Sequence, residues 1–187
     1  MSSDAWNWVA EPRYASFCLV FARTKTADNV LEVYGADPEA AVHMTLKESL
    51  AAFPYQDVEV LLRVGHLGDW TFCYEDRRLL GNTGEVRTAL SWGCETISLH
   101  KGGDGTKYFE RMEDCRRLEL FEPRRPSDVR GEGPFVFSAL VHDKLSAAGP
   151  NTLGMSALTM VLTERLGLEL DRATLDGPLL TAPLRGP

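Results

Sequence analysis

The feature that most constrains the fold is a nearly continuous apolar run at residues 16–23, Ser-Phe-Cys-Leu-Val-Phe-Ala-Arg. A strand with one face in solvent alternates apolar and polar side chains, and this run does not alternate. The run is therefore typical of a central strand that is covered on both faces. A chain of 187 residues is long enough to bury such a strand within one domain.

The remaining elements follow from shorter patterns. Strands are predicted where alternating or apolar runs are bounded by turn residues, at 58–64, 70–75, 94–100, 106–112 and 116–122. Helices are predicted from capping residues and helical spacing of apolar residues, at 24–35, 46–53, 82–93, 135–149 and 156–166. Because hairpin links outnumber helical crossovers, we expect an α+β fold, with a mainly antiparallel sheet of five to six strands and the helices packed on one face.

The distribution of proline and glycine suggests how the chain is divided. Residues 1–123 are expected to form the α+β core domain. Residues 124–134 combine prolines, glycines and charges, a composition typical of a loop or hinge. Residues 135–187 are expected to form a C-terminal helical segment packed on this core, with an irregular stretch at 176–183.

Charge and hydropathy exclude several classes of protein. The chain has 20 Lys and Arg against 27 Asp and Glu, a net charge of −7. An acidic chain lacks the basic surface that grips a phosphate backbone, so we expect no nucleic-acid partner. The first residues lack the basic and apolar regions of a secretory signal, and no apolar run approaches the ~20 residues of a membrane span. We therefore expect a cytoplasmic protein without membrane contact.

Cysteines and histidines are too widely spaced to predict a metal site. The cysteines are Cys18, Cys73, Cys94 and Cys115. Zinc ligands usually come in pairs a few residues apart, so buried or free thiols are the simpler interpretation. The histidines, each isolated, are His43, His66, His100 and His142. No metal and no cofactor are predicted.

Residues 102–106, Gly-Gly-Asp-Gly-Thr, permit two interpretations. The string resembles the glycine-rich phosphate loop of the diacylglycerol kinase and NAD kinase families, where such a loop opens an apolar helix. Here the following residues are charged and alternate as in a strand. Since a tight turn needs the same glycines for positive φ, we interpret the string as a hairpin turn.

No constellation of residues predicts catalysis. The Gly-x-Ser-x-Gly nucleophile elbow is absent from the sequence, and no catalytic residue is assigned. Ser98 and His100 share one strand face but lack an identified acid, and Glu75 ends the strand that begins at Trp70. Convergence of these side chains would give a small pocket. Trp70, Glu75, Ser98 and His100 are therefore the candidates for an alternative ligand-binding pocket.

The tryptophans provide candidates for a partner-binding surface. Trp6 and Trp8 lie in a polar leader before the first strand. They either clamp this leader onto the domain or form an exposed anchor for a partner protein, because tryptophan is enriched in interface hot spots. Trp70 and Trp92 adjoin apolar segments and are expected in the core.

Several segments together resemble a known family. They are residues 17–23, 60–65, 68–75, 96–100, 118–123 and 166–170. The chain resembles, over roughly residues 5–123, an uncharacterised family of actinobacteria, common in streptomycetes, that is defined only as a domain of unknown function. This resemblance implies a fold and an origin, and it supplies no catalytic residues.

Two functional hypotheses follow. The first is a non-catalytic protein-binding module of immunity or regulatory type, because an acidic surface suits a basic partner protein. The alternative is a small-molecule-binding domain or a small enzyme, with its pocket between the sheet and the C-terminal helices or beside the Trp70 strand.

Overall fold

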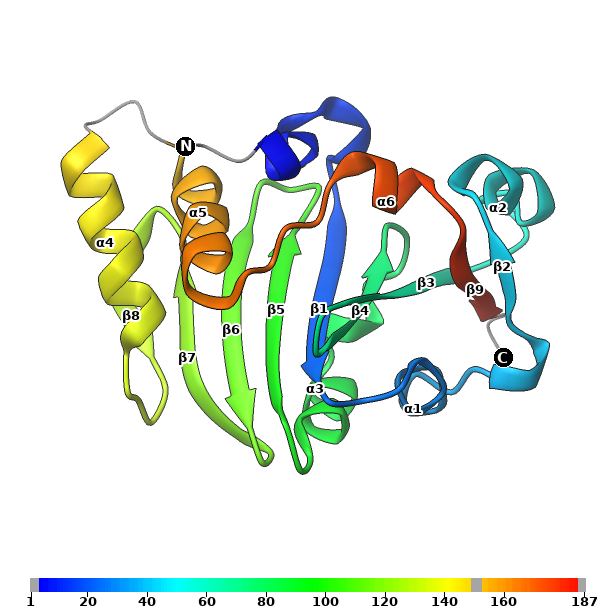
Figure 1. Ribbon diagram of the computed structural model, residues 1–187, viewed down its shortest axis with the longest axis horizontal. Helices are drawn as coiled ribbons and strands as arrows, with labels where there is room; N and C mark the ends of the chain where they lie inside the picture. Colours follow the sequence, from blue (N-terminus) through cyan, green and yellow to red (C-terminus); the bar gives the residue numbers. More distant parts are fainter. Residues whose placement is uncertain (1–3, 149–152, 185–187) are drawn as a thin grey trace.

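Strand β1 (Phe17–Arg23) is the middle strand of a nine-stranded sheet in the computed structural model, which describes residues 4–148 and 153–184 (Figure 1). The strand order is β2-β9-β3-β4-β1-β5-β6-β7-β8, and all neighbouring strands pair antiparallel. The other strands are β2 (Val42–Met44), β3 (Val60–Leu67), β4 (Trp70–Glu75), β5 (Glu95–Lys101), β6 (Lys107–Glu113), β7 (Arg116–Glu122), β8 (Arg125–Arg130) and β9 (Leu179–Leu184).

Strand β1 is buried on both faces, as the apolar run predicted. Phe17, Leu19 and Phe21 point into one apolar cluster, on what we call the first face of the sheet. Cys18, Val20 and Ala22 point into another cluster on the second face. Each of these six side chains is at most 3% exposed. The antiparallel α+β architecture of the sequence prediction is therefore correct, and both faces of the sheet need cover.

Helices provide this cover on both faces, so the expectation that they pack on one face is wrong. The first face lies under η1 (Asp4–Ala10), η2 (Pro12–Tyr14), α4 (Val136–Ala148), α5 (Gly154–Leu166) and α6 (Arg172–Asp176). The second face is covered by α1 (Ala27–Val33), α3 (Gly84–Ser91) and the turn η4 (Leu80–Asn82). Near β2 lie η3 (Pro38–Ala40) and α2 (Leu46–Ala52). None of the helices within residues 4–148 and 153–184 has the length and hydropathy of a membrane span.

The sequence prediction of five to six strands missed β2, β8 and β9. Strand β8 lies within residues 124–134, which were predicted as a loop, and its charges and Pro126 are tolerated because it pairs only with β7 at the sheet edge. Strand β9 lies in the stretch predicted to be irregular. It carries Pro183, but β2 pairs only with residues 179–181, so Pro183 has a neighbouring strand on one side alone. The C-terminal segment therefore supplies a strand to the core sheet.

The second face is only partly covered by apolar packing. Helix α3 contacts β5 and β6, but the apolar cluster of this face includes no described residue of β6, β7 or β8. The uncovered part carries polar side chains from neighbouring strands. They occupy one cross-strand row, in which Ser98 pairs with Glu110, Glu110 with Leu120, and Leu120 with Arg130.

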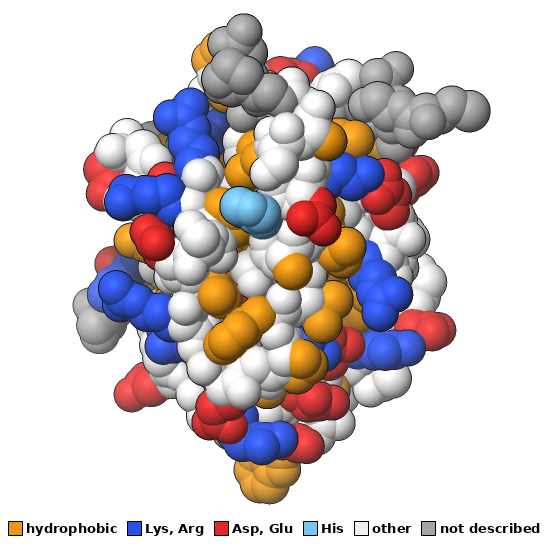
Figure 2. All heavy atoms as spheres, turned by 90° about the vertical axis from the view of Figure 1, so that its left-hand side faces the viewer, with side chains coloured by type: hydrophobic (Ala, Val, Ile, Leu, Met, Phe, Trp, Pro, Cys, Tyr) orange, Lys and Arg blue, Asp and Glu red, His pale blue; other side chains and the backbone are white. Residues whose placement is uncertain are grey.

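The acidic excess of the chain does not gather at the α4–β8 end of the molecule. Figure 2 shows this end, where acidic and basic side chains are interspersed around a strip of hydrophobic ones. Salt bridges between neighbouring surface residues, such as Lys144 with Glu164 and Arg125 with Glu122, contribute to this mixture. The end shown in Figure 2 is therefore not a strongly acidic surface.

A buried carboxylate attaches α4 to the sheet. Glu119 of β7 is fully buried, and its oxygens accept hydrogen bonds from the backbone N–H groups of Phe137 and Ser138, each at 3.1 Å. The Ser138 hydroxyl donates to the same carboxylate at 3.1 Å. These donors lie in the first turn of α4, where N–H groups have no partner within the helix and favour a negative charge. Glu119 thus acts as a cap from a distant strand.

Replacing Glu119 should weaken the fold through this cap. We expect Glu119→Ala to lower the free energy of unfolding by about 2 kcal/mol, because it leaves buried donors without an acceptor. Urea denaturation measures the change. The control is Glu132→Ala, whose side chain is 61% exposed and lies 3.7 Å from Arg116, and which should change stability by less than about 0.5 kcal/mol. Equal stabilities of the two variants would show that the cap contributes nothing.

Candidate functional site

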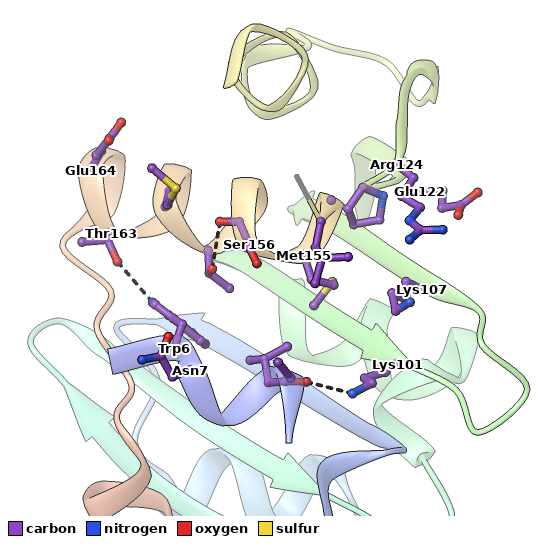
Figure 3. A pocket seen from close by; sticks show the side chains of 17 residues that line it. Trp6, Asn7, Lys101, Lys107, Glu122, Arg124, Met155, Ser156, Thr163 and Glu164 are labelled. Atoms are coloured by element: carbon purple, nitrogen blue, oxygen red, sulfur yellow. Dashed lines mark hydrogen bonds between the residues drawn. The ribbon is translucent and has the colours of Figure 1, made fainter. Parts of the chain in front are cut away.

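A cavity of about 350 Å³ lies on the first face, between η1, α5 and the ends of β5, β6 and β7 (Figure 3). We call it the η1–α5 cavity. Its volume falls in the range of small-molecule sites, about 300–1,000 Å³. It occupies the place that the alternative hypothesis gave to a pocket, between the sheet and the C-terminal helices.

Part of the cavity wall is apolar. Trp6, Val9 and Met155 are buried in the core and also line the cavity. Leu153 and Met160 also line it and are 50% and 37% exposed. Exposed apolar side chains beside a cavity lose contact with water when a ligand enters, which favours binding of an apolar group.

Three cations line one end of the same cavity. Lys101 and Lys107 face each other across the β5–β6 ladder, and Arg124 follows the end of β7. Figure 3 shows these three side chains on one side, and Trp6 with Thr163 on the other. None of the three cations has an ion pair with a described residue. The cavity therefore has an apolar part and a positively charged end.

The two carboxylates that border this cavity are already paired with cations elsewhere. Glu122 lies 3.1 Å from Arg125, and Glu164 lies 2.6 Å from Lys144. Lys101 donates from Nζ to the carbonyl oxygen of Val9 at 2.8 Å, a bond that leaves its charge uncompensated. Burial, and then the neighbouring Lys107, lower the pKa of Lys101. Uncompensated positive charge thus faces the cavity.

The turn at residues 102–106 places the two lysines opposite each other. Gly102 N–H donates to the carbonyl of Thr106 at 2.8 Å, and Gly105 adopts a φ of +89°. Asp104 accepts from the Thr106 N–H at 3.0 Å. These contacts close the β5–β6 hairpin, so the prediction of a hairpin turn is confirmed, and no helix begins after the glycines.

The structure places Trp6 and Trp8 inside the domain. They are 6% and 1% exposed, and the Nε1 of Trp8 donates to the carbonyl of Leu170 at 2.6 Å. The Nε1 of Trp6 bonds to the Thr163 hydroxyl and the Leu168 carbonyl, both at 3.1 Å. The leader is therefore clamped onto the C-terminal segment, which is the first of the two alternatives for these residues, and an exposed anchor does not fit their burial.

The other two tryptophans were both expected in the core, and only one is there. Trp70 is 5% exposed and packs in the apolar cluster of the first face. Trp92 is 75% exposed, so its prediction is wrong. It forms the C-cap of α3, beyond the helical positions that face the sheet.

The four candidates for the alternative pocket do not form one site. Cys18 of β1 pairs with Glu75 of β4 on one side and with His100 of β5 on the other, so these side chains share the second face of the sheet. Ser98 of β5 lies on the same face. Ser98 and His100 line a second cavity there. Trp70 lies on the opposite face of the sheet, so it is separated from the other three.

Glu75 is buried beside this second cavity and supports one of its walls. Its carboxylate accepts from the N–H groups of Leu80 at 2.7 Å and Gly81 at 2.9 Å, which fixes the turn η4. A Cβ on Gly81 would lie 2.6 Å from the Glu75 oxygen, so only glycine permits this approach. Burial raises the pKa of Glu75 to about 7, and the bonds from Gly81 and Leu80 offset only part of this effect.

The raised pKa of Glu75 predicts a dependence of stability on pH. Between about pH 4.5 and 7 the folded protein holds a proton on Glu75 that the unfolded chain has released. The free energy of unfolding should therefore fall as the pH rises through this range, by up to about 3 kcal/mol. Glu75→Gln mimics the protonated form and should lack this decrease. Urea denaturation of both proteins at several pH values tests it, and parallel stability profiles would refute the assignment to Glu75.

The sequence analysis did not identify the charged residues of either cavity. Lys101 and Lys107 could have been found, because the predicted hairpin puts them opposite each other. Arg87, Glu110 and Arg117 come together through α3, β6 and β7. Nothing in their spacing indicates this cluster. Among the described residues, no group of His, Cys, Asp and Glu side chains is arranged to hold a metal ion.

Comparison with known proteins identifies a family without an assigned activity. Neither a curated protein nor a solved structure matches the chain. One family model does match, and it spans residues 2–152, from η1 to the end of α4. Since this match covers most of the sequence, the chain belongs to the family of unknown function DUF6461.

Proposed function

We propose that this protein is a non-catalytic binding protein whose ligand is a small amphiphilic anion, held in the η1–α5 cavity. The observation that carries the proposal is the set of three cations, Lys101, Lys107 and Arg124, at one end of a cavity with apolar walls. A ligand with an anionic head and an apolar chain complements both parts.

The positions of the side chains suggest the orientation of this ligand. Its carboxylate or phosphate head would contact Lys107 and Arg124, with Lys101 behind them. Its apolar chain would extend from Met155 toward Trp6 (Figure 3), and Met160 lines the same cavity. The head would lie near the start of α5, where the helix dipole also favours negative charge.

Electrostatics supports an anion over a neutral ligand. Like charges directly opposite on neighbouring strands destabilise a sheet, and Lys101 faces Lys107 in this way. An anionic head between these lysines replaces repulsion with attraction. Because both side chains are partly buried, the interaction is less screened by solvent than a surface ion pair.

The composition of the lining favours binding over catalysis. None of the described residues that line this cavity is a histidine, cysteine or aspartate. The two glutamates, Glu122 and Glu164, are engaged with cations outside it. Of the hydroxyl groups that line the cavity, those of Thr159 and Thr163 donate to backbone carbonyls. Among the described residues none of these hydroxyls is hydrogen-bonded to a basic side chain, the arrangement that activates a nucleophile.

A small molecule fits the geometry better than a protein partner does. The protein-binding hypothesis relied on Trp6 and Trp8 as exposed anchors, and both are buried. It also relied on the acidic excess of the chain, which does not gather at the end seen in Figure 2. A protein partner, a cytoplasmic location and an actinobacterial origin stay predictions from the sequence.

Removing one cation should weaken binding of a model ligand. We expect decanoate to bind the wild-type protein, and Lys107→Gln to raise its Kd about tenfold through loss of one charged contact. Lys47→Gln, an exposed position on α2, removes the same charge away from the cavity and should leave the Kd unchanged. Isothermal titration calorimetry measures the three affinities.

Two further ligands separate the head from the chain. Decanol and decyltrimethylammonium have the same apolar chain with a neutral and a cationic head, and both should bind more weakly than decanoate. Higher salt should weaken decanoate binding selectively. If decanol bound as tightly as decanoate, or if Lys107→Gln and Lys47→Gln behaved alike, the proposed role of the cations would be wrong.

A further inference from the structure

The second cavity, on the opposite face of the sheet, has the properties of a separate anion site. It has a volume of about 280 Å³ and lies over the part of the second face that apolar packing leaves uncovered. Its lining includes Arg87 of α3, Ser98 and His100 of β5, Glu110 of β6, Arg117 of β7 and Arg130 of β8. We call it the arginine cavity.

One buried carboxylate holds two of the arginines side by side. Glu110 accepts from Nη1 of Arg87 and from Nε of Arg117, each at 2.6 Å and each on a different oxygen. The Glu110 side chain is 4% exposed, so this cluster forms the floor of the cavity. Each guanidinium uses one N–H group on Glu110, which leaves several of its donors for a ligand.

The arginine cavity carries an excess of positive charge. Arg130 lines it as a third arginine and has no ion pair with any residue that the structure describes. Among the residues that line the cavity, three arginines against one glutamate leave an excess of two positive charges. A phosphate monoester has a charge of about −1.5 to −2 at neutral pH, which matches this excess.

His100 forms part of the wall of the arginine cavity. Its side chain is buried, with 9% of the residue exposed, and it borders the cavity. Its Nδ1 has no hydrogen-bond partner within the described part of the chain. Nδ1 itself has almost no accessible surface, so it lies behind the cavity wall, and a ligand would meet other atoms of the ring.

From these observations we infer that the arginine cavity binds the phosphoryl group of a small phosphate monoester. The planar guanidinium groups of Arg117 and Arg130 donate to the phosphoryl oxygens in pairs. Arg87 and Glu110 hold the arrangement in place. The His100 ring and the Ser98 side chain border the same ligand. This site is separate from the η1–α5 cavity, because the sheet lies between them.

Binding of phenyl phosphate tests the inference. We expect isothermal titration calorimetry to detect saturable binding to the wild-type protein, and Arg130→Gln to raise the Kd roughly tenfold. Arg125→Gln, at the other end of β8 and paired with Glu122, is the matched control and should keep the wild-type affinity. Decanoate should bind Arg130→Gln as it binds the wild type, so failure of one site is distinguishable from failure of the other.

A measurement on the unaltered protein covers the case in which Arg130→Gln does not fold. In ¹⁵N-labelled protein, phenyl phosphate should shift the ring nitrogen signals of His100 and leave those of His43, on the distant strand β2, unchanged. Benzoate has the same ring with a single negative charge and should bind more weakly. Equal binding of benzoate, an unchanged His100 signal, or an equal loss of affinity in Arg125→Gln would overturn the inference.

Discussion

The burial of β1 on both faces is the constraint from which the rest of the arrangement follows. Phe17, Leu19 and Phe21 require cover on one side and Cys18, Val20 and Ala22 on the other. The chain meets the first requirement with elements from both of its ends. Trp6 of η1 bonds to Thr163 of α5, and Trp8 of η1 bonds to Leu170 beyond that helix. The chain meets the second requirement with the short helices α1 and α3, which leave the β7–β8 end of that face without apolar cover. The η1–α5 cavity lies on the first face of the sheet, and the arginine cavity lies on the second.

Both cavities are positively charged in a chain whose net charge is −7. Folding places Lys101 opposite Lys107, where like charges repel, and it joins Arg87 and Arg117 through the one carboxylate of Glu110. In our proposals these are the residues that recognise an anion.

The sequence predicted the elements that depend on local patterns and missed those that depend on distant partners. The apolar run of β1 and the glycine turn before Lys107 each carry a local signal, and both predictions are confirmed. The run also required cover on both faces, which contradicts the expectation of helices on one face. Strands β8 and β9 contain prolines and were missed, because only their positions in the sheet make those prolines tolerable. The cluster of Arg87, Glu110 and Arg117 has no local signal at all.

In our proposal, uncompensated cations beside an apolar wall let the η1–α5 cavity bind an amphiphilic anion. The most direct test is NMR of the protein labelled with ¹³C in its methionine methyl groups, titrated with decanoate. We expect the signals of Met155 and Met160, which line the cavity, to shift together and saturate, while those of Met44 and Met112 stay in place. Unchanged signals of Met155 and Met160, or equal shifts at all four positions, would contradict it.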